Sequence, residues 1–431
     1  MSLSPKQHYP VIVIGGGQAG LAMSYHLSRN NIDHVVIEKN TIAHAWKTQR
    51  WDAFCLVTPN WQCQLPGFSY PGNDPKGFML RDDIVAYVEN YAKKIAAPVR
   101  EGVAVTRLKR EDDGRFLLTT TSGELSADQI VLAVGGYHIP NIPRMAERID
   151  SSITQIHSSS YRNPDQLPAG DILVVGSGQS GCQIAEDLHL AGHQVHLAVG
   201  SAPRCPRVYR GRDAVEWLDD LGQYDLPVDK HSLKEKVRKN ANHYLTGRDG
   251  GRDIDLRKFA LEGMRLYGRL NNIEKGVLKF GNDLATNLDN ADRVYNGICG
   301  LIDDHIAKAG IEAPAGVHYD PVWQPSATPT ALDLANSNIK SIIWTTGFQS
   351  DWSWVELPMF DGAGYPTHKR GITSADGAYV LGLPWLYTWG SGRFIGVGRD
   401  AEYLATAIVQ RNEKRETVDR PTPVTYVESA A

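Results

Sequence analysis

Two glycine-rich motifs, each placed directly after an apolar run, constrain the fold of this chain more than any other feature. The run 11–14 leads into Gly15-Gly16-Gly17-Gln18-Ala19-Gly20, and the run 171–175 leads into Gly176-Ser177-Gly178-Gln179-Ser180-Gly181. A buried parallel strand, a tight turn and a helix start form a unit whose backbone N–H groups hold a pyrophosphate. Two such units predict an α/β fold with two Rossmann-like dinucleotide-binding domains.

Length and composition set the class of protein. With 431 residues, 42% hydrophobic, 22% charged and a net charge of −4, the chain is expected to form two or three soluble domains and gives no reason to expect nucleic-acid binding. Only ten residues precede the first strand, without the pattern of a signal peptide, and the run 11–14 is far too short to span a membrane. A cytoplasmic location without membrane attachment is therefore predicted.

The five cysteines exclude one class of flavoenzyme. They are Cys55, Cys63, Cys182, Cys205 and Cys299, and they form neither a CxxC pair nor a metal-ligand pattern. Flavoenzymes that reduce disulfides need a closely spaced redox-active pair. We expect buried thiols, no bound metal and no iron–sulfur cluster.

The first motif is predicted to bind FAD. Glu38 ends the second expected strand, 23 residues after Gly15, where an acid accepts hydrogen bonds from a ribose hydroxyl. The aromatic-rich segment 43–71 and the step from strand 129–133 into glycines are expected beside the flavin ring. The predicted FAD contacts are Gly15, Gly17, Gln18, Ala19, Gly20, Glu38, Lys39, Trp46, Val105, Ala133 and Gly135.

The second motif is predicted to bind NADPH rather than NADH. The same offset from Gly176 falls on Val199, and a series of arginines follows, so a 2′-phosphate would be attracted rather than repelled. Arg204, Arg207, Arg210 and Arg212 cannot all contact one phosphate, so some are expected to be structural. The predicted nucleotide contacts are Gly176, Gly178, Gln179, Ser180, Gly181, Ser201 and Arg204.

The remaining pattern gives the domain limits. Residues 1–145 and 341–411 are expected to form the FAD domain, and 146–212 with 314–340 the NADPH domain. Between them, 213–313 has helical apolar spacing at 256–270 and 284–306, with Gly310 as a C-cap, and predicts a helical insertion. Such an insertion serves as a substrate cap, a homodimer contact or a plain structural cover. A helix at 401–411 and a flexible tail at 412–431 complete the prediction.

These features together resemble the class B flavin-containing monooxygenases, including YUCCA-like and bacterial enzymes. The resemblance rests on both glycine motifs, on the segment from Ala133 to Pro143 with its Ala-x-Gly-x-x-x-x-Pro-x-x-Pro spacing, and on the step from Thr345 to Phe348. It implies that NADPH reduces FAD, that O2 forms a C4a-(hydro)peroxyflavin, and that a small apolar or nucleophilic substrate is oxygenated. It also implies that polar residues of a loop near the flavin, here Thr58 and Asn60, help to hold the oxygen adduct.

Two other functions fit the same pattern. An NAD(P)H-dependent flavin reductase, oxidase or electron-transfer protein would use both cofactors without inserting oxygen. A non-catalytic redox sensor would keep the fold alone, although it would not need the second motif. No nucleophile–base arrangement is apparent, and His44, His138 and His157 are interpreted as structural or ligand-positioning residues.

Overall fold

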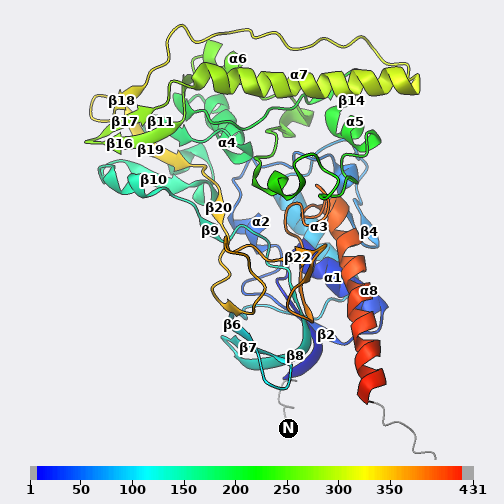
Figure 1. The fold of residues 1–431 in the computed structure, drawn as a ribbon. Coiled ribbons are helices and arrows are strands. Elements are labelled where there is room, and N and C mark those ends of the chain that lie inside the picture. Colours follow the sequence, from blue (N-terminus) through cyan, green and yellow to red (C-terminus); the bar gives the residue numbers. More distant parts are fainter. Residues whose placement is uncertain (1–6, 420–431) are drawn as a thin grey trace, which may run out of the picture.

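Both glycine motifs lie where a strand passes into a helix, as predicted. The computed structural model describes residues 7–419 and consists of two sheet-based lobes (Figure 1). Strand β1 (His8–Ile14) precedes helix α1 (Gln18–Arg29), and β11 (Asp171–Val175) precedes α4 (Gln179–Leu190). The last four residues of each strand are buried, which explains their continuous apolar runs.

The first lobe is built on a sheet in the order β21-β6-β7-β8-β1-β2-β5. β1 pairs in parallel with β2 (His34–Ile37) and with β8 (Gly123–Leu132), which includes residues 129–132 of the strand predicted at 129–133. Helices α1 and α3 (Arg81–Lys94) belong to this lobe, whose other sheet strands are β5 (Val99–Arg100), β6 (Val105–Arg110), β7 (Phe116–Thr120), β21 (Val355–Glu356) and β24 (Ala378–Val380).

The second lobe holds a parallel sheet in the order β10-β19-β11-β12-β15. Its strands besides β11 are β10 (Thr154–His157), β12 (Val195–Ala198), β15 (Arg265–Tyr267) and β19 (Ile339–Trp344). The predicted domain limit at residue 341 is therefore wrong, since it cuts through β19, which pairs with β10 and β11. An apolar strand has the same sequence pattern in either sheet, and only its pairing partners determine the lobe to which it belongs.

The predicted helical insertion is helical only in part. After α5 (Ala214–Asp220), helix α6 (Leu256–Leu261) ends early, and the chain forms β15, β16 (Leu270–Glu274) and β17 (Val277–Phe280) instead of a continuous helix. β15 extends the parallel sheet beside β12, so its apolar residues are buried by sheet pairing. The second helix, α7 (Leu284–Ala309), is confirmed, and Gly310 ends it at φ 63°.

The C-terminal helix is longer than predicted. α8 (Phe394–Asp419) begins before residue 401 and includes residues 412–419, which the sequence had assigned to a flexible tail. Gln129 Nε2 donates to Asn412 Oδ1 at 2.7 Å and fixes that part of the helix on the sheet. The rest of the predicted tail, 420–431, lies outside the described residues. α8 runs along the first lobe beside α1 (Figure 1).

Two connections cross between the lobes side by side. β9 (Ile139–Pro140) leaves the first lobe and β20 (Phe348–Gln349) returns to it, and the two pair in antiparallel fashion (Figure 1). The other short elements are α2 (His44–Thr48), β3 (Gln64–Leu65), β4 (Phe68–Ser69), β13 (Val208–Tyr209), β14 (Arg212–Asp213), β18 (Ala331–Asp333), β22 (His368–Lys369) and β23 (Ile372–Thr373).

Candidate cofactor and active site

One large cavity brings the two glycine motifs together. Its volume is about 1380 Å³, and Gly15 and Gly176 both line it. Pockets for a single small ligand typically enclose roughly 300–1,000 Å³. The cavity is therefore large enough for more than one ligand.

The first glycine turn is fixed by close backbone contacts. Gly15 has φ 110°, and a Cβ there would lie 2.5 Å from the Ala133 carbonyl oxygen. A Cβ on Gly20 would lie 1.8 Å from the Gly15 carbonyl oxygen. Side chains are therefore excluded at both positions. Helix α1 begins at Gly17 without a side-chain cap, which leaves its first N–H groups free for a pyrophosphate.

Glu38 lies at the end of β2, beside this turn. Its carboxylate accepts hydrogen bonds from the backbone N–H of Gly16 at 2.7 Å and of Asn40 at 2.8 Å. Two backbone donors hold the side chain in place, and a carboxylate has further lone pairs for a ribose hydroxyl. The cavity lining includes ten of the predicted FAD contacts: Gly15, Gly17, Gln18, Ala19, Glu38, Lys39, Trp46, Val105, Ala133 and Gly135. Gly20 does not line the cavity and instead allows helix α1 to pack closely against the Gly15 carbonyl group.

The second turn repeats the first. Gly176 has φ 108°, and its Cβ would lie 2.9 Å from Thr345 Oγ1, while a Cβ on Gly181 would lie 2.0 Å from the Gly176 carbonyl oxygen. Gln179 exchanges hydrogen bonds with the backbone of Leu245 at 2.5 and 3.0 Å. Gly176, Gly178, Gln179 and Ser180 line the cavity, whereas Gly181 serves packing.

Arg204 is not a phosphate contact, which corrects the sequence prediction. Its side chain is buried, its Nη1 lies 2.9 Å from Asp292, and its guanidinium stacks 4.1 Å above the Tyr319 ring. Burial opposes the charge, but Asp255 and other neighbours outweigh it and raise the pKa of Arg204. Arg207, Arg210 and Arg212 likewise pair with Asp213, Asp303 and Asp220.

The arginine beside Ser201 is Arg269, which the sequence did not indicate. Arg269 Nη2 donates to Ser201 Oγ at 3.3 Å, and both residues line the cavity beyond the end of β12. Arg269 follows β15, and β15 lies next to β12. Because the apolar spacing at 256–270 is typical of a helix, no sequence pattern indicated this contact.

Asn60 is also placed differently from its prediction. Its Nδ2 donates to the Asp74 carbonyl oxygen at 2.9 Å and its Oδ1 accepts from the Met79 N–H at 2.8 Å. Both amide atoms thus hold a loop, and Asn60 is absent from the cavity lining. Thr58 does line the cavity, and so does Gln62, which the sequence reading missed.

His157 and His138 have hydrogen-bond partners within the chain. His157 Nε2 lies 2.9 Å from the Gly347 carbonyl oxygen and Nδ1 lies 2.9 Å from Ser159 Oγ, while burial lowers its pKa. His138 contacts the carbonyl oxygens of Gly135 and Asp351, each at 3.0 Å. This agrees with a structural interpretation of both.

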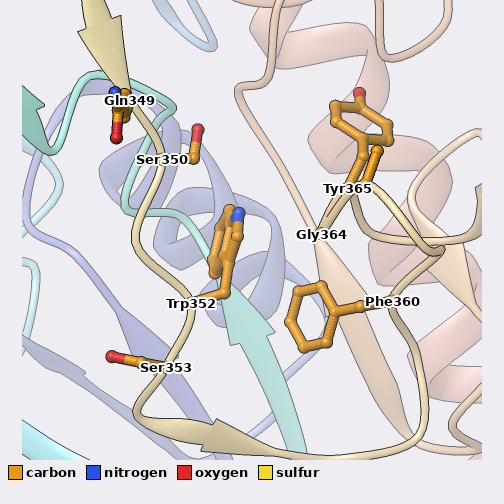
Figure 2. A pocket seen from close by; sticks show the side chains of 8 residues that line it. Gln349, Ser350, Trp352, Ser353, Phe360, Gly364 and Tyr365 are labelled. Carbon is orange, nitrogen blue, oxygen red and sulfur yellow. The ribbon is translucent and has the colours of Figure 1, made fainter. Parts of the chain in front are cut away.

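A second cavity lies outside this site. It encloses about 590 Å³ and is lined by the segment from Gln349 to Ser353 and by Phe360 to Tyr365. Figure 2 shows Trp352 and Phe360 on facing loops, with ring centroids 5.8 Å apart. It shares no residue with either glycine motif.

The described residues carry few other reactive groups. All five cysteines are buried and unpaired, and residues 7–419 contain no cluster of side chains suited to a metal ion. Within the same residues, no helix has the length and apolarity required to cross a membrane.

Comparison with known proteins agrees with this two-nucleotide site. A family model described as pyridine nucleotide-disulphide oxidoreductase matches residues 12–244. The chain belongs to this family. An uncharacterized CzcO-like oxidoreductase of Geobacillus kaustophilus is 34% identical over 403 residues, which are 93% of this chain and 98% of that protein. The probable indole-3-pyruvate monooxygenase YUCCA1 of Arabidopsis thaliana is 30% identical over 196 residues, covering 44% and 47% of the two chains.

Among solved structures, a flavin-containing monooxygenase from Stenotrophomonas maltophilia shares the fold. Its TM-score is 0.65 at 18% identity, over 94% of this chain and 99% of that one. The predicted fold is confirmed, and the YUCCA relatives and this structural neighbour support the resemblance to the class B flavin-containing monooxygenases. The family and the relative from Geobacillus kaustophilus mark this chain as an oxidoreductase, and the flavin monooxygenases among the matches support the prediction of an enzyme that uses FAD and NADP(H).

Proposed function

We propose that this enzyme is an FAD-dependent, NADPH-consuming monooxygenase that forms a C4a-(hydro)peroxyflavin and oxygenates a small apolar or nucleophilic substrate. The observation that carries the proposal is the single cavity lined by both nucleotide turns. Bound FAD would supply the redox chemistry. The residues of the chain bind both cofactors, orient them toward each other and exclude water.

Each nucleotide turn has a separate task in this proposal. The turn at Gly15, with Glu38, holds FAD through the α1 N-terminus and the ribose hydroxyls. The turn at Gly176 holds the NADPH pyrophosphate at the start of α4, and Ser201 with Arg269 binds the 2′-phosphate. Thr58 lines the cavity, and its hydroxyl would serve as a hydrogen-bond donor to the bound flavin.

The substrate part of the cavity is apolar and comes from several segments. Phe54 and Val57 belong to the aromatic-rich segment, Leu218 belongs to the insertion, and Trp389 follows the last strand. Trp389 lines the cavity, whereas the nearby Trp385 does not. An apolar surface excludes water, and this would protect an oxygen adduct of the flavin from decay to H2O2.

Two other functions remain to be tested against this one. A flavin reductase or oxidase would consume NADPH and return all oxygen as H2O2. A redox sensor would bind FAD without needing NADPH, and the second turn lining the same cavity speaks against it. We further propose a cytoplasmic location, and a homodimer contact through the insertion stays a prediction.

The experiment is a coupled oxidation assay on the purified FAD-loaded protein. NADPH consumption, O2 consumption and H2O2 release are measured with a panel of small apolar amines, thioethers and ketones. We expect at least one compound to lower the H2O2 yield per NADPH and to gain one oxygen atom. NADPH oxidation with stoichiometric H2O2 for every compound would favour the oxidase, and no NADPH oxidation would favour the sensor.

A further inference from the structure

Part of the large cavity is formed by residues of neither glycine motif. We call it the aromatic chamber and define it by Gln62, Tyr224, Asn242, His243, Trp389 and Arg393, all of which line the cavity. The Tyr224 and Trp389 rings stack in parallel with centroids 4.9 Å apart, and the His243 ring lies 6.0 Å from Trp389. Burial lowers the pKa of His243 to about 4, so this ring is neutral at pH 7.

Arg393 carries a positive charge in this chamber without an acidic partner. Its guanidinium lies 4.5 Å from the Trp389 ring centre, and its Nη2 donates a long hydrogen bond of 3.3 Å to Asn242 Oδ1. No ion pair joins Arg393 to a carboxylate of residues 7–419. Burial lowers the pKa of this guanidinium.

Three deeply buried arginines, unlike Arg393, each have an acidic partner in the described part of the chain. Arg204, Arg207 and Arg257 are each about 1–2% exposed, and each pairs with an aspartate, at 2.9, 2.5 and 2.5 Å. Arg393 is only half-buried and lines the cavity, so an anion in the cavity can reach its charge. Its guanidinium is therefore available to an anionic ligand, whereas the three buried arginines are already paired.

Gln62 gives a second, independent sign of a missing ligand. It is only 2% exposed, yet neither its amide nitrogen nor its amide oxygen has a well-formed hydrogen bond to the described chain, although the Tyr224 hydroxyl lies nearby. Buried amides are normally satisfied, because an unmade hydrogen bond costs about 1–3 kcal/mol. A ligand with a polar end in the chamber would satisfy this group.

We propose that the aromatic chamber binds an apolar carboxylate, with its carboxylate group on Arg393 and Gln62 and its apolar body against Tyr224 and Trp389. The planar guanidinium matches the two oxygens of a carboxylate. A single arginine neutralises one negative charge, so a monoanion fits better than a phosphate dianion. This inference deepens the proposed function, on which it rests, by naming the substrate class of the same cavity.

The cofactors have other cationic and backbone partners. In the proposed function, the pyrophosphates bind at the starts of α1 and α4, and the 2′-phosphate binds Arg269. Arg50 also lacks an acidic partner within the described chain, but it stacks 5.0 Å from the ring centre of Trp46, a predicted FAD contact. Arg393 is the cation that remains for the substrate.

The test is a binding titration that needs neither NADPH nor O2. The probes are 2-naphthylacetate and 2-naphthylacetamide, which have nearly the same shape and differ in charge. Each is added to the oxidised FAD-loaded protein at pH 7.5, and binding is followed by calorimetry and by the flavin absorption spectrum. We expect the carboxylate to bind at least about tenfold more tightly than the amide, as a charge-assisted hydrogen bond provides.

Four variants locate the effect. Arg393→Gln is expected to bring the ratio of the two dissociation constants to about one while FAD is retained, and Arg393→Lys to restore part of the ratio. Arg293→Gln, on the exposed face of α7, is the matched control and should behave as wild type. Gln62→Leu is expected to weaken carboxylate binding at least about threefold.

Several results would overturn the proposal. These are equal binding of both probes by wild type, no binding of either, or an unchanged ratio in Arg393→Gln. If Arg393→Gln leaves the ratio unchanged and shifts the flavin reduction potential, the guanidinium serves the flavin and not a substrate. Because the titration requires no turnover, a failed oxygenation assay would leave its result standing.

Discussion

Arg269 provides the sharpest test of the nucleotide assignment, because no sequence motif points to it. In Arg269→Gln the guanidinium that lies 3.3 Å from Ser201 is removed. A charge-assisted hydrogen bond contributes about 1.5–3 kcal/mol, and the exposure of this arginine reduces that to about 1–2 kcal/mol. We expect the Kd for NADPH to rise about 5- to 30-fold, since 1.4 kcal/mol corresponds to tenfold.

The assay is anaerobic reduction of the flavin in a stopped-flow instrument, with NADPH and NADH titrated separately. The Kd for NADH should stay unchanged in Arg269→Gln, because NADH has no 2′-phosphate. The same preparation of Ser201→Ala should lose a smaller part of the preference. Equal loss of affinity for both nucleotides would refute a 2′-phosphate contact, and equal reduction of wild type by both would refute the NADPH assignment itself.

The remaining predictions concern stability and the second turn. Arg204→Gln removes one of the two buried arginines that pair with Asp292, the other being Arg257, so we expect about 3 kcal/mol lower unfolding free energy in urea titrations, with nucleotide preference kept in the folded fraction; lost preference with full stability would contradict this. Gly181→Ala places a Cβ about 2.0 Å from the Gly176 carbonyl oxygen and should abolish NADPH binding while FAD stays bound, as equilibrium dialysis would measure. Burial lowers the pKa of His368 to about 4, so unfolding free energy should fall as pH drops below about 6.5, by about 2 kcal/mol at pH 5. Between about pH 6.5 and 4 the unfolded state binds a proton at His368 and the folded state does not. If His368→Gln keeps the pH profile of wild type, His368 is not the cause of the lost stability.

The sequence was sufficient for the parts of the site that depend on local backbone geometry. A glycine turn between a buried strand and a helix is a local structure, so both turns, Glu38 and the length of α7 were predictable. The spacing of apolar residues and the C-cap at Gly310 belong to single elements, and they needed no knowledge of tertiary contacts.

The rest depended on partners far away in the chain. β19 lies in the second sheet because of its pairing with β10 and β11, which no local pattern reveals. The contacts of Arg204 and Arg269 were not predicted for the same reason: Asp292 lies 88 residues from Arg204, and Ser201 lies 68 residues from Arg269. Asn60 was misassigned because its loop supplies partners at Asp74 and Met79.

The central claim is that this protein stabilises an oxygen adduct on its flavin. The most direct measurement is anaerobic reduction with NADPH, then rapid mixing with oxygenated buffer while flavin spectra are recorded, with and without 2-naphthylacetate. The account predicts a blue-shifted single absorption band that persists before oxidised flavin returns. Direct return to oxidised flavin with stoichiometric H2O2 under both conditions would contradict it.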